Sequence, residues 1–528
     1  MKRAVSLFLF AVILLTGISP LAYARAAADG GETFKSFVAT DIHHFVTDEV
    51  PVVDGKPFFY DNLGLTPTLA PAILTEFLRQ AAESDADYVF LTGDLADIPD
   101  IKQAKAVAKK LASFERSSGK KVFVINGNHD TDYTDSRSPG TVGLKEFKSI
   151  YARFGYDEAL CTDSASCSYT ADLKNGYRLI AIDALDRPGT GGATINRALA
   201  KWIRAQAVRA RRDGKKLVAL MHHPLMNHFT MMSTLLPVFV VSNSKEACRL
   251  FARCGIQTVF TGHFHQNDIA VYRGFRDVYD IETTSLSCYP NAYRTVVFRP
   301  NAVDISTVPI AKIDVSSLPA GYSEAQKAYI ASDLEGYAYD CFREDSIATI
   351  LGYLNAEKLA GKLGITDPTL KRTLDKLLAA FAECFSLPLY GEKNSMEALS
   401  RQIGLSLPES EYETVNDAAA ALVAAQLAGD EHFDSRSPLV RILLFSTLSV
   451  LCREGRRTVG VDRLLEAIRR SSLVSRNPQL SRLFANLSAA LLLRGCVLDS
   501  MLLPTEPLLI GLTVDRCPGD NNVTLRLR

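Results

Sequence analysis

The sequence carries no excess of positive charge. Its 59 Lys and Arg residues equal its 59 Asp and Glu residues, and the formal net charge at pH 7 is +0. A protein that holds nucleic acid by its phosphates normally carries a basic excess, so this balance argues against a nucleic-acid duplex as a partner. The basic run Arg209 to Lys216 is interpreted as a solvated helix end and turn.

Two common ligand-binding motifs are also missing. The ten cysteines include no C-x-x-C pair, which makes a thiolate zinc site improbable. The glycine-rich segment Arg187 to Gly192 is not followed by Gly-Lys-Ser or Gly-Lys-Thr, so it is not a phosphate-cradling loop. We interpret this segment as a flexible lid or a plain connection.

The N-terminus has the features of a signal peptide over residues 1–24. Lys2 and Arg3 precede the apolar stretch Val5 to Leu15, and Ala22-Tyr23-Ala24 is a small-x-small cleavage pattern. We expect cleavage near Ala24 and export to the periplasm or the medium. An uncleaved membrane anchor is the alternative, because the apolar stretch is nearly long enough to span a bilayer.

Export would give the cysteines an oxidising environment. The close pairs expected to form disulfides are Cys161 with Cys167 and Cys248 with Cys254. The alternative is that several cysteines are small buried hydrophobic residues, an interpretation that fits Cys452 in its apolar helical run and likewise Cys496.

A chain of 528 residues is longer than a single hydrophobic core normally stabilises, so two domains are expected after the signal peptide. Residues 30–312 alternate strand and helix patterns, which is typical of right-handed crossovers in a largely parallel sheet. Helices are expected over Thr66–Ala82 and Lys102–Phe114, and at the cap residues Thr194 and Ser244. Further strands are expected at Tyr169–Asp172, Tyr177–Ile182, Tyr293–Arg299 and Asp304–Val308.

Residues 316–528 change character and predict an all-α C-terminal domain. Few β-branched runs occur there, and no His or carboxylate cluster has ligand spacing. A helical bundle without chemistry of its own is expected, with a possible protein partner. Helical spacing covers Ser323–Arg343, Leu370–Phe385, Ala418–Leu427, Leu439–Arg453, Val461–Arg470 and Pro478–Leu493.

Five short apolar runs in the first domain end in Asp, Asn or His. In an open α/β sheet the C-terminal ends of the strands line one crevice, so these side chains are expected to form one site. Eight of the nine histidines lie within the first 265 residues, which supports that grouping. The polar residues at these ends are Asp41 and His43, Asp94 and Asp97, Asn128 with His129 and Asp130, His222 and His223, and His263 and His265.

Carboxylate, amide and imidazole groups are donors suited to divalent ions such as Mn, Fe and Zn. Seven or eight such groups exceed what one ion takes, so two ions sharing a carboxylate are expected. Such a pair can hold a phosphoryl oxygen and lower the pKa of a bridging water, giving a hydroxide aimed in line at phosphorus. A further imidazole nearby could protonate the leaving group.

The ordered motifs resemble those of the calcineurin-like metallophosphoesterases. They are Asp41-x-His43, Gly93-Asp94, Gly127-Asn128-His129-Asp130, His222 before Pro224, and Gly262-His263-x-His265, within Phe37 to Val308. The resemblance implies a β-sandwich flanked by helices. It assigns one metal to Asp41, His43, Asp94 and His265, and the other to Asp94, Asn128, His222 and His263. It makes His129 the imidazole that acts on the leaving group, with Asp130 orienting it.

The resemblance implies a phosphoesterase acting on a phosphodiester or a phosphomonoester, as a small molecule, a lipid or an envelope headgroup. Ile98-Pro99 follow Asp97, where protein phosphatases have Arg-Gly, so a protein-phosphatase role is disfavoured. The chain looks more like exported bacterial phosphoesterases. The alternative is a catalytically weak metal-binding envelope protein that recruits a partner. Outside the motifs, His223 is interpreted as a packing residue and His228 as a possible substrate contact.

Overall fold

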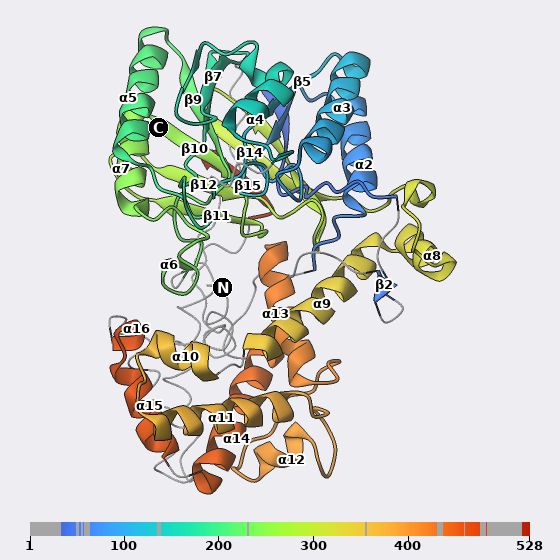
Figure 1. Ribbon diagram of the computed structural model, residues 1–528, viewed down its shortest axis with the longest axis vertical. Coiled ribbons are helices and arrows are strands. Elements are labelled where there is room, and N and C mark those ends of the chain that lie inside the picture. The colour runs from blue at the N-terminus through green and yellow to red at the C-terminus, as the bar shows by residue number, and fades with distance from the viewer. Residues whose placement is uncertain are drawn as a thin grey trace.

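The computed structural model of the chain describes residues 33–48, 52–53, 56–57, 64–134, 139–229, 232–353, 356–429, 437–458, 460–475, 482 and 520–527. An α/β body contains the two large sheets, and a mostly helical part lies against one end of it (Figure 1). The expected signal peptide and the expected helix Pro478–Leu493 lie outside the described residues.

The first sheet has six strands in the order β15-β14-β13-β1-β4-β5. Strands β1, β4 and β5 are parallel, while β13, β14 and β15 continue the sheet in antiparallel pairings. The bounds are β1 Phe34–Ala39, β4 Tyr88–Leu91, β5 Lys121–Val124, β13 Ala292–Phe298, β14 Ala302–Pro309 and β15 Asn522–Arg526.

The second sheet has seven strands in the order β11-β12-β10-β9-β8-β7-β6. Its central strands β8, β9, β10 and β12 are parallel, so their C-terminal ends reach the same edge. The bounds are β6 Cys161–Thr162, β7 Tyr169–Asp172, β8 Tyr177–Ile182, β9 Lys216–Met221, β10 Ile256–Thr261, β11 Asp268–Tyr272 and β12 Val278–Glu282. A separate small hairpin joins β2 Val52–Val53 to β3 Lys56–Pro57.

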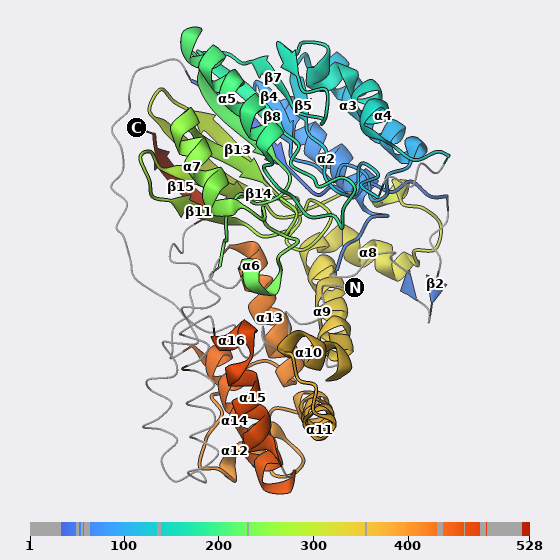
Figure 2. The ribbon, with the colours of Figure 1, turned by 60° about the vertical axis from the view of Figure 1, so that its left-hand side comes forward.

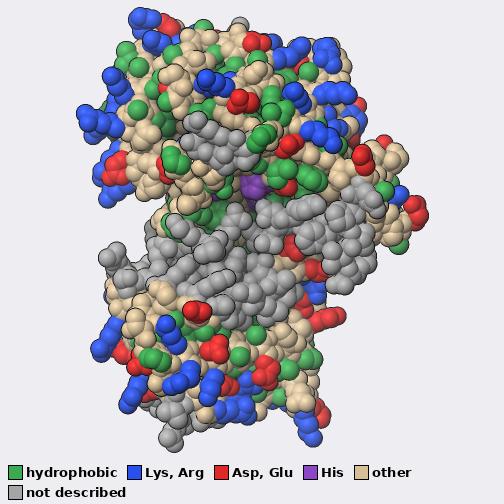
Figure 3. All heavy atoms as spheres, viewed as in Figure 1, with side chains coloured by type: hydrophobic (Ala, Val, Ile, Leu, Met, Phe, Trp, Pro, Cys, Tyr) green, Lys and Arg blue, Asp and Glu red, His purple; other side chains and the backbone are tan. Residues whose placement is uncertain are grey.

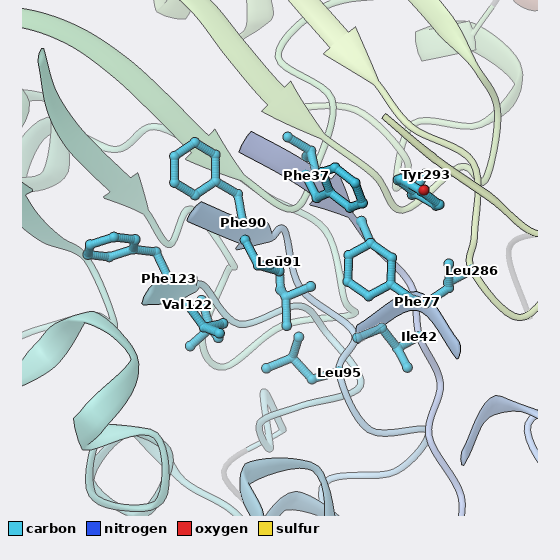
Figure 4. Packing of buried hydrophobic residues seen from close by; sticks show 14 of the residues in the cluster. Phe37, Ile42, Phe77, Phe90, Leu91, Leu95, Val122, Phe123, Leu286 and Tyr293 are labelled. Atoms are coloured by element: carbon cyan, nitrogen blue, oxygen red, sulfur yellow. The ribbon is translucent and has the colours of Figure 1, made fainter. Parts of the chain in front are cut away.

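Aromatic side chains fill the space where the sheets meet. Phe34 of β1 stacks on Phe298 of β13, with ring centroids 4.4 Å apart, and lies 5.2 Å from Tyr177 of the other sheet. On the opposite face of the first sheet, Phe37 and Tyr293 pack at 4.8 Å beneath Phe77 of α2 (Figure 4). Burying one such side chain contributes about 1.5–3 kcal/mol, so this core fixes the strands whose ends carry the polar residues.

Helices cover the outer faces of both sheets, and all four expected helices of this body are present. The helix expected at Thr194 is capped instead by Asn196, whose side chain accepts the Leu199 N–H. The helix expected at Ser244 begins there, without a side-chain cap. The bounds are α2 Ala70–Glu83, α3 Ile101–Ser118, α4 Leu144–Ile150, α5 Arg197–Arg212, α6 Met232–Leu235 and α7 Ser244–Cys254, with single turns at Ala152–Tyr156 and Val315–Ser317.

The C-terminal region is mostly helical, as expected, but not wholly so. Strand β15 returns to the α/β body and pairs with β14, which the sequence analysis did not anticipate (Figure 2). None of the described helices is long and apolar enough to cross a membrane. The described helices are α8 Glu324–Ser332, α9 Leu334–Tyr353, α10 Ala356–Leu363, α11 Pro368–Phe385, α12 Met396–Arg401, α13 Val415–Ala428, α14 Pro438–Arg457, α15 Val461–Arg470 and α16 Ser472–Ser475.

Neither expected disulfide is present, so that prediction is wrong for both pairs. Cys161, Cys167, Cys248 and Cys254 are free thiols. Cys248 and Cys254 are six residues apart on α7, which separates them by about 9 Å along the helix axis. A disulfide needs Cα atoms within about 7 Å, so one straight helix cannot bridge this pair. Cys248 is instead a buried hydrophobic residue.

Candidate metal centre

The strand-end residues converge as predicted. Asp41 follows β1, Asp94 follows β4, Asn128 follows β5, His222 follows β9 and His263 follows β10. The two sheets place these ends at one edge of the sandwich. Three groups of side chains there have donor atoms within 4.8 Å of one another: Asp41, His43 and His265; Asp94, His222 and His263; and His43, Asp97 and His129.

The first group surrounds a carboxylate oxygen of Asp41. Its Oδ1 lies 3.1 Å from His265 Nε2 and 3.8 Å from His43 Nε2. Its Oδ2 accepts hydrogen bonds from the Thr40 hydroxyl and from the His263 backbone N–H. One oxygen of Asp41 is therefore fixed by the protein, and the other points toward the imidazoles.

The second group forms around His222. Its Nε2 lies 3.1 Å from Asp94 Oδ2 and 3.1 Å from Asn128 Oδ1. Its Nδ1 donates to the Thr92 carbonyl at 3.0 Å, which fixes the tautomer and leaves the Nε2 lone pair facing the two oxygens. A second imidazole, His263, lies beside it with ring centroids 4.9 Å apart.

Asp94 belongs to the second group and also faces His43, which is in the first. The same oxygen that lies 3.1 Å from His222 Nε2 lies 3.9 Å from His43 Nε2. The other oxygen accepts the His129 backbone N–H at 2.8 Å. One oxygen of Asp94 therefore faces imidazoles from two of the three groups.

The donor set fits divalent ions on two independent grounds. His43 Nε2 is buried without a hydrogen-bond partner, while its Nδ1 lies 3.2 Å from Asp97 Oδ1. An imidazole that is anchored through one nitrogen and directs the other at carboxylates has the usual arrangement of a metal ligand. The mixture of imidazole, carboxylate and amide donors suits Mn, Fe or Zn.

Backbone strain marks the same residues. Five strand-end residues have positive φ between 47° and 74°, a region that residues other than glycine and asparagine rarely adopt. Every other non-glycine residue of this kind in the described ranges is an asparagine. Such strain persists where the surrounding structure enforces it, and it clusters at functional sites. The five residues are Asp41, His43, Asp94, His263 and His265.

Two glycines allow the close approach of these loops. A Cβ on Gly127 would lie 2.1 Å from Asp94 Oδ1, and one on Gly262 would lie 2.3 Å from Asp41 Oδ2. Both contacts are far inside van der Waals range. The glycine that precedes Asn128 and the one that precedes His263 are therefore required by the carboxylates that face them.

Charge coupling shifts the protonation of the metal-free site. Burial alone would lower the pKa of His222, but Asp94 and Asp41 outweigh it and raise the pKa to about 9. Burial likewise opposes the charged form of His43, but the bond to Asp97 and the neighbouring carboxylates raise its pKa to about 9. Burial disfavours ionisation of Asp94, yet its neighbouring imidazoles, chiefly His222, lower its pKa well below the usual range. Protons and metal ions thus compete for the same donors.

The proposed catalytic pair needs one correction. Asp130 was expected to orient His129, but its two oxygens accept the backbone N–H groups of Leu95, Ala96 and Gly127. The His129 ring is oriented instead by the Asp97 carbonyl, which lies 2.7 Å from Nδ1. Asp130 organises the backbone beneath the site, because a carboxylate can gather several N–H donors that would otherwise be buried without partners.

Asp97, one of the expected site residues, has an orienting role that its sequence position alone does not reveal. Its side chain anchors His43 at 3.2 Å and its carbonyl anchors His129 at 2.7 Å. One residue thus orients a candidate ligand and the candidate acid. Its place three residues after Asp94 at a strand end was the available signal.

Two further described histidines, His223 and His228, have structural roles. His223 is buried, and Nε2 donates to the Gly191 carbonyl at 2.8 Å. Burial and the neighbouring His222 lower its pKa to about 3, so it is neutral. The expected substrate contact by His228 is wrong: this residue is 4 % exposed and is paired through Nδ1 with Asp268. The imidazole of His228 therefore pairs with buried carboxylates and does not face solvent.

Two acidic residues of β12 accept hydrogen bonds from the backbone of the loops that carry the candidate ligands. Asp280 accepts the backbone N–H groups of Leu225 and Met226, just after His222. Glu282 accepts the N–H of Phe264, between His263 and His265, at 3.2 Å. The signal for this pair was two acids spaced by two in an apolar strand, which places both on one face.

The helical part reaches the same loops. Phe264 packs partly buried against the hydrophobic core of the helical part, and its ring lies 5.3 Å from Phe239. The Val238 carbonyl lies 3.3 Å from His263 Nε2, and the Asn267 N–H donates to the Leu427 carbonyl at the end of α13. In the space-filling view a histidine side chain is visible in the hollow between the two parts (Figure 3).

One family model matches the part of the chain that contains this site. The family model of the calcineurin-like phosphoesterases matches residues 34–267. No curated protein gives a significant match. Among solved structures, a dimetal phosphatase from Danio rerio is 10% identical with a TM-score of 0.39, covering 52% of this chain and 96% of its own. The phosphopantetheinyl hydrolase of Mycobacterium tuberculosis is 14% identical with a TM-score of 0.26, covering 48% and 90%.

The matched range begins at β1 and ends two residues beyond His265, so it contains every strand end described above. The clustered His and Asp side chains within it are those of a metal-dependent phosphoric ester hydrolase. Residues 34–267 of this chain therefore belong to the calcineurin-like phosphoesterase family.

Proposed function

We propose that the chain is an exported phosphoesterase that uses two divalent ions to hydrolyse a phosphodiester or a phosphomonoester by in-line attack of a water-derived hydroxide. The observation that carries this proposal is the placement of Asp94 Oδ2 between His222 Nε2 at 3.1 Å and His43 Nε2 at 3.9 Å. Bound there, the ions would supply a hydroxide at neutral pH and neutralise charge on the phosphoryl oxygens.

The protein would hold the ions with two sets of donors. Asp41, His43, Asp94 and His265 form one set, and Asp94, Asn128, His222 and His263 form the other. The hydrogen bonds to the far side of His43 and His222 support this assignment, since each leaves the second ring nitrogen for a ligand role. Mn, Fe and Zn all suit this donor set.

His129 is proposed to act on the leaving group. A carbonyl only accepts, so the contact with the Asp97 carbonyl requires that His129 Nδ1 carries the proton. Nε2 is then the nitrogen available to the substrate, and in the protonated ring it can donate to the departing oxygen. His129 is half-buried and lies 4.7 Å from the ring of His43, which places it beside the first set of donors.

The expected export to the periplasm or the medium would supply soluble esters, lipid headgroups or other envelope headgroups as substrates. The domain limits proposed with it are a signal peptide at 1–24, a phosphoesterase domain at 30–312 and a C-terminal domain at 316–528, whose strand β15 pairs with β14 of the phosphoesterase domain. The packing of Phe264 into the core of the helical part supports a role for the C-terminal domain beside the site.

The deciding experiment is hydrolysis of nitrophenyl phosphate and bis-nitrophenyl phosphate by protein loaded with Mn, Fe or Zn. We expect turnover of at least one ester, and loss of turnover when a chelator removes the ions. If metal-loaded protein hydrolyses neither ester, the result would support the alternative function, a metal-binding envelope protein that recruits a partner. Comparing the two esters also decides between monoesterase and diesterase activity.

A further inference from the structure

Positive charge is concentrated over the outer layer of the second sheet, although the net charge of the whole chain is zero. Three segments of the second sheet's outer layer carry thirteen Lys and Arg residues and only three Asp and Glu. Over the first sheet, residues 101–121 of the α3 segment also carry seven basic residues and one acidic. The α2 segment packed beside it, 70–87, carries one basic residue and four acidic ones, so the two helices together are nearer balance. We call the first region the basic surface; it comprises 197–216 (α5 and the following turn), 244–255 (α7) and 272–277 (the β11–β12 turn).

The three segments form one continuous surface. Helices α5 and α7 pack side by side, and the charges of Arg204 and Arg211 on α5 act on the thiol of Cys254 at the end of α7. A Cβ on the next residue, Gly255, would lie 3.0 Å from a guanidinium nitrogen of Arg276 in the turn. Lys and Arg side chains are visible along this side of the molecule, over α5 and α7 (Figure 3).

Most of these cations are available to a partner. Arg204, Arg211 and Arg253 are exposed, and no ion pair is found for them among the described residues. The same holds for five more basic residues on the two helices: Arg197, Lys201, Arg209, Lys245 and Arg249. Internal ion pairing therefore does not account for the concentration of charge.

Large apolar side chains stand exposed within the same surface. Phe275 is 85 % exposed at the tip of the β11–β12 turn, flanked by Arg273 and Arg276. Val208 is 62 % exposed on α5. Cations combined with protruding apolar residues are the usual composition of a surface that lies on an anionic bilayer.

We propose that the basic surface docks the protein on an anionic phospholipid bilayer, with Phe275 entering the interfacial layer. The surface is formed by the outer sides of two helices and a protruding turn. This shape suits contact with a flat bilayer, whereas a nucleic-acid duplex would be expected to lie in a groove of the protein. The net charge of zero for the whole chain means that the attraction is local to this surface.

Docking would set the orientation of the metal centre. Strand β12 is parallel to β10, so the β11–β12 turn lies at the N-terminal ends of the strands whose C-terminal ends carry His222 and His263. Strands of six residues separate the two ends by about 20 Å. The metal centre would therefore face away from the bilayer that Phe275 enters, which favours a soluble ester over a headgroup of that same bilayer.

The test is binding of the full chain to vesicles of phosphatidylcholine alone and of phosphatidylcholine mixed with phosphatidylglycerol. The variant Arg204→Gln, Arg211→Gln, Arg253→Gln should lose roughly 100-fold in affinity for the mixed vesicles, since each cation near such a surface contributes about a factor of five. Phe275→Ser should lose roughly tenfold. The matched control is Lys102→Gln, Lys105→Gln, Lys109→Gln on α3, which removes equal charge elsewhere.

All variants share one N-terminal segment, so its own affinity for lipid cancels in the comparison. Hydrolysis of a soluble nitrophenyl ester should be unchanged by the surface variants, which separates this proposal from the proposed function. Equal loss of binding in the α3 control would overturn the docking surface. So would equal binding to neutral vesicles, or tighter binding of duplex RNA than of mixed vesicles.

Discussion

The ring of Phe239 lies against the imidazole of His263, with centroids 4.9 Å apart and the planes tilted by 33°. Phe239 also belongs to the hydrophobic core of the helical part, together with residues of α11 and α14. A candidate metal ligand is thus held between its own loop and a side chain that packs with the helices. The contact gives the C-terminal region a physical link to the site.

The substitution Phe239→Ala should weaken metal binding at the second set of donors. His263 would lose the ring against which it packs, and the neighbouring Val238 carbonyl would be less well fixed. We expect at least tenfold weaker binding of one ion and little change for the other, measured by metal titration of chelated protein.

The control for this variant is Phe381→Ala on α11, in the same core but with no contact to the ligand loops among those described. Both substitutions should cost about 3 kcal/mol of stability. If the Phe381 variant loses metal to the same degree, the effect is general destabilisation, and the link between Phe239 and His263 carries no specific role.

The substitution His129→Ala should leave both ions in place and lower turnover by roughly 10²- to 10⁴-fold, the usual contribution of a general acid. The loss should be smaller for a substrate whose leaving group is already acidic, because that group needs no proton. Metal analysis and turnover with leaving groups of different acidity provide the measurement. Loss of an ion in this variant would move His129 into the ligand set.

The metal-free protein should become less stable as the pH rises. His43 and His222 have pKa values raised to about 9 in the folded protein, above the value of 6.5 expected in the unfolded chain. Their contribution to stability is therefore complete below pH 6.5 and is lost as the pH rises through 9. Thermal unfolding of chelated protein, followed from about pH 6 to about pH 9.5, should therefore show a midpoint that falls as the pH rises.

Metal-loaded protein should show the opposite trend over that range, since binding requires the imidazoles to lose their protons. A flat midpoint for the chelated protein would mean that the carboxylates do not hold protons on these two histidines. A falling midpoint in both forms would assign the titration to groups elsewhere in the chain.

Features that depend only on neighbouring residues could be predicted from the sequence. An apolar run followed at once by Asp, Asn or His predicted the strands that precede Asp41, Asp94, Asn128, His222 and His263, because a buried strand and its polar end are contiguous. The cap of α5 was misplaced by two residues, since Thr194 and Asn196 are both good capping residues and only the course of the chain decides between them.

What the sequence did not reveal depends on distant partners. Glu282 supports Phe264 from a neighbouring strand, and strand β15 pairs with β14 across more than two hundred residues. The spacing of Asp280 and Glu282 indicates which face of the strand they share, but nothing local to either strand identifies Phe264 or β14 as the partner. The role of Asp130 was mistaken for a related reason, because its three backbone donors are spread over two loops.

The account rests on a single carboxylate shared by two ions, and metal content measures this directly. Protein purified without chelators and analysed by mass spectrometry of its metals should contain two divalent ions per chain, and Asp94→Ala should contain neither. Its control, Asp304→Ala at a distant strand of the first sheet, should keep both. Two ions retained after loss of Asp94 would contradict the shared site and the hydrolytic mechanism built on it.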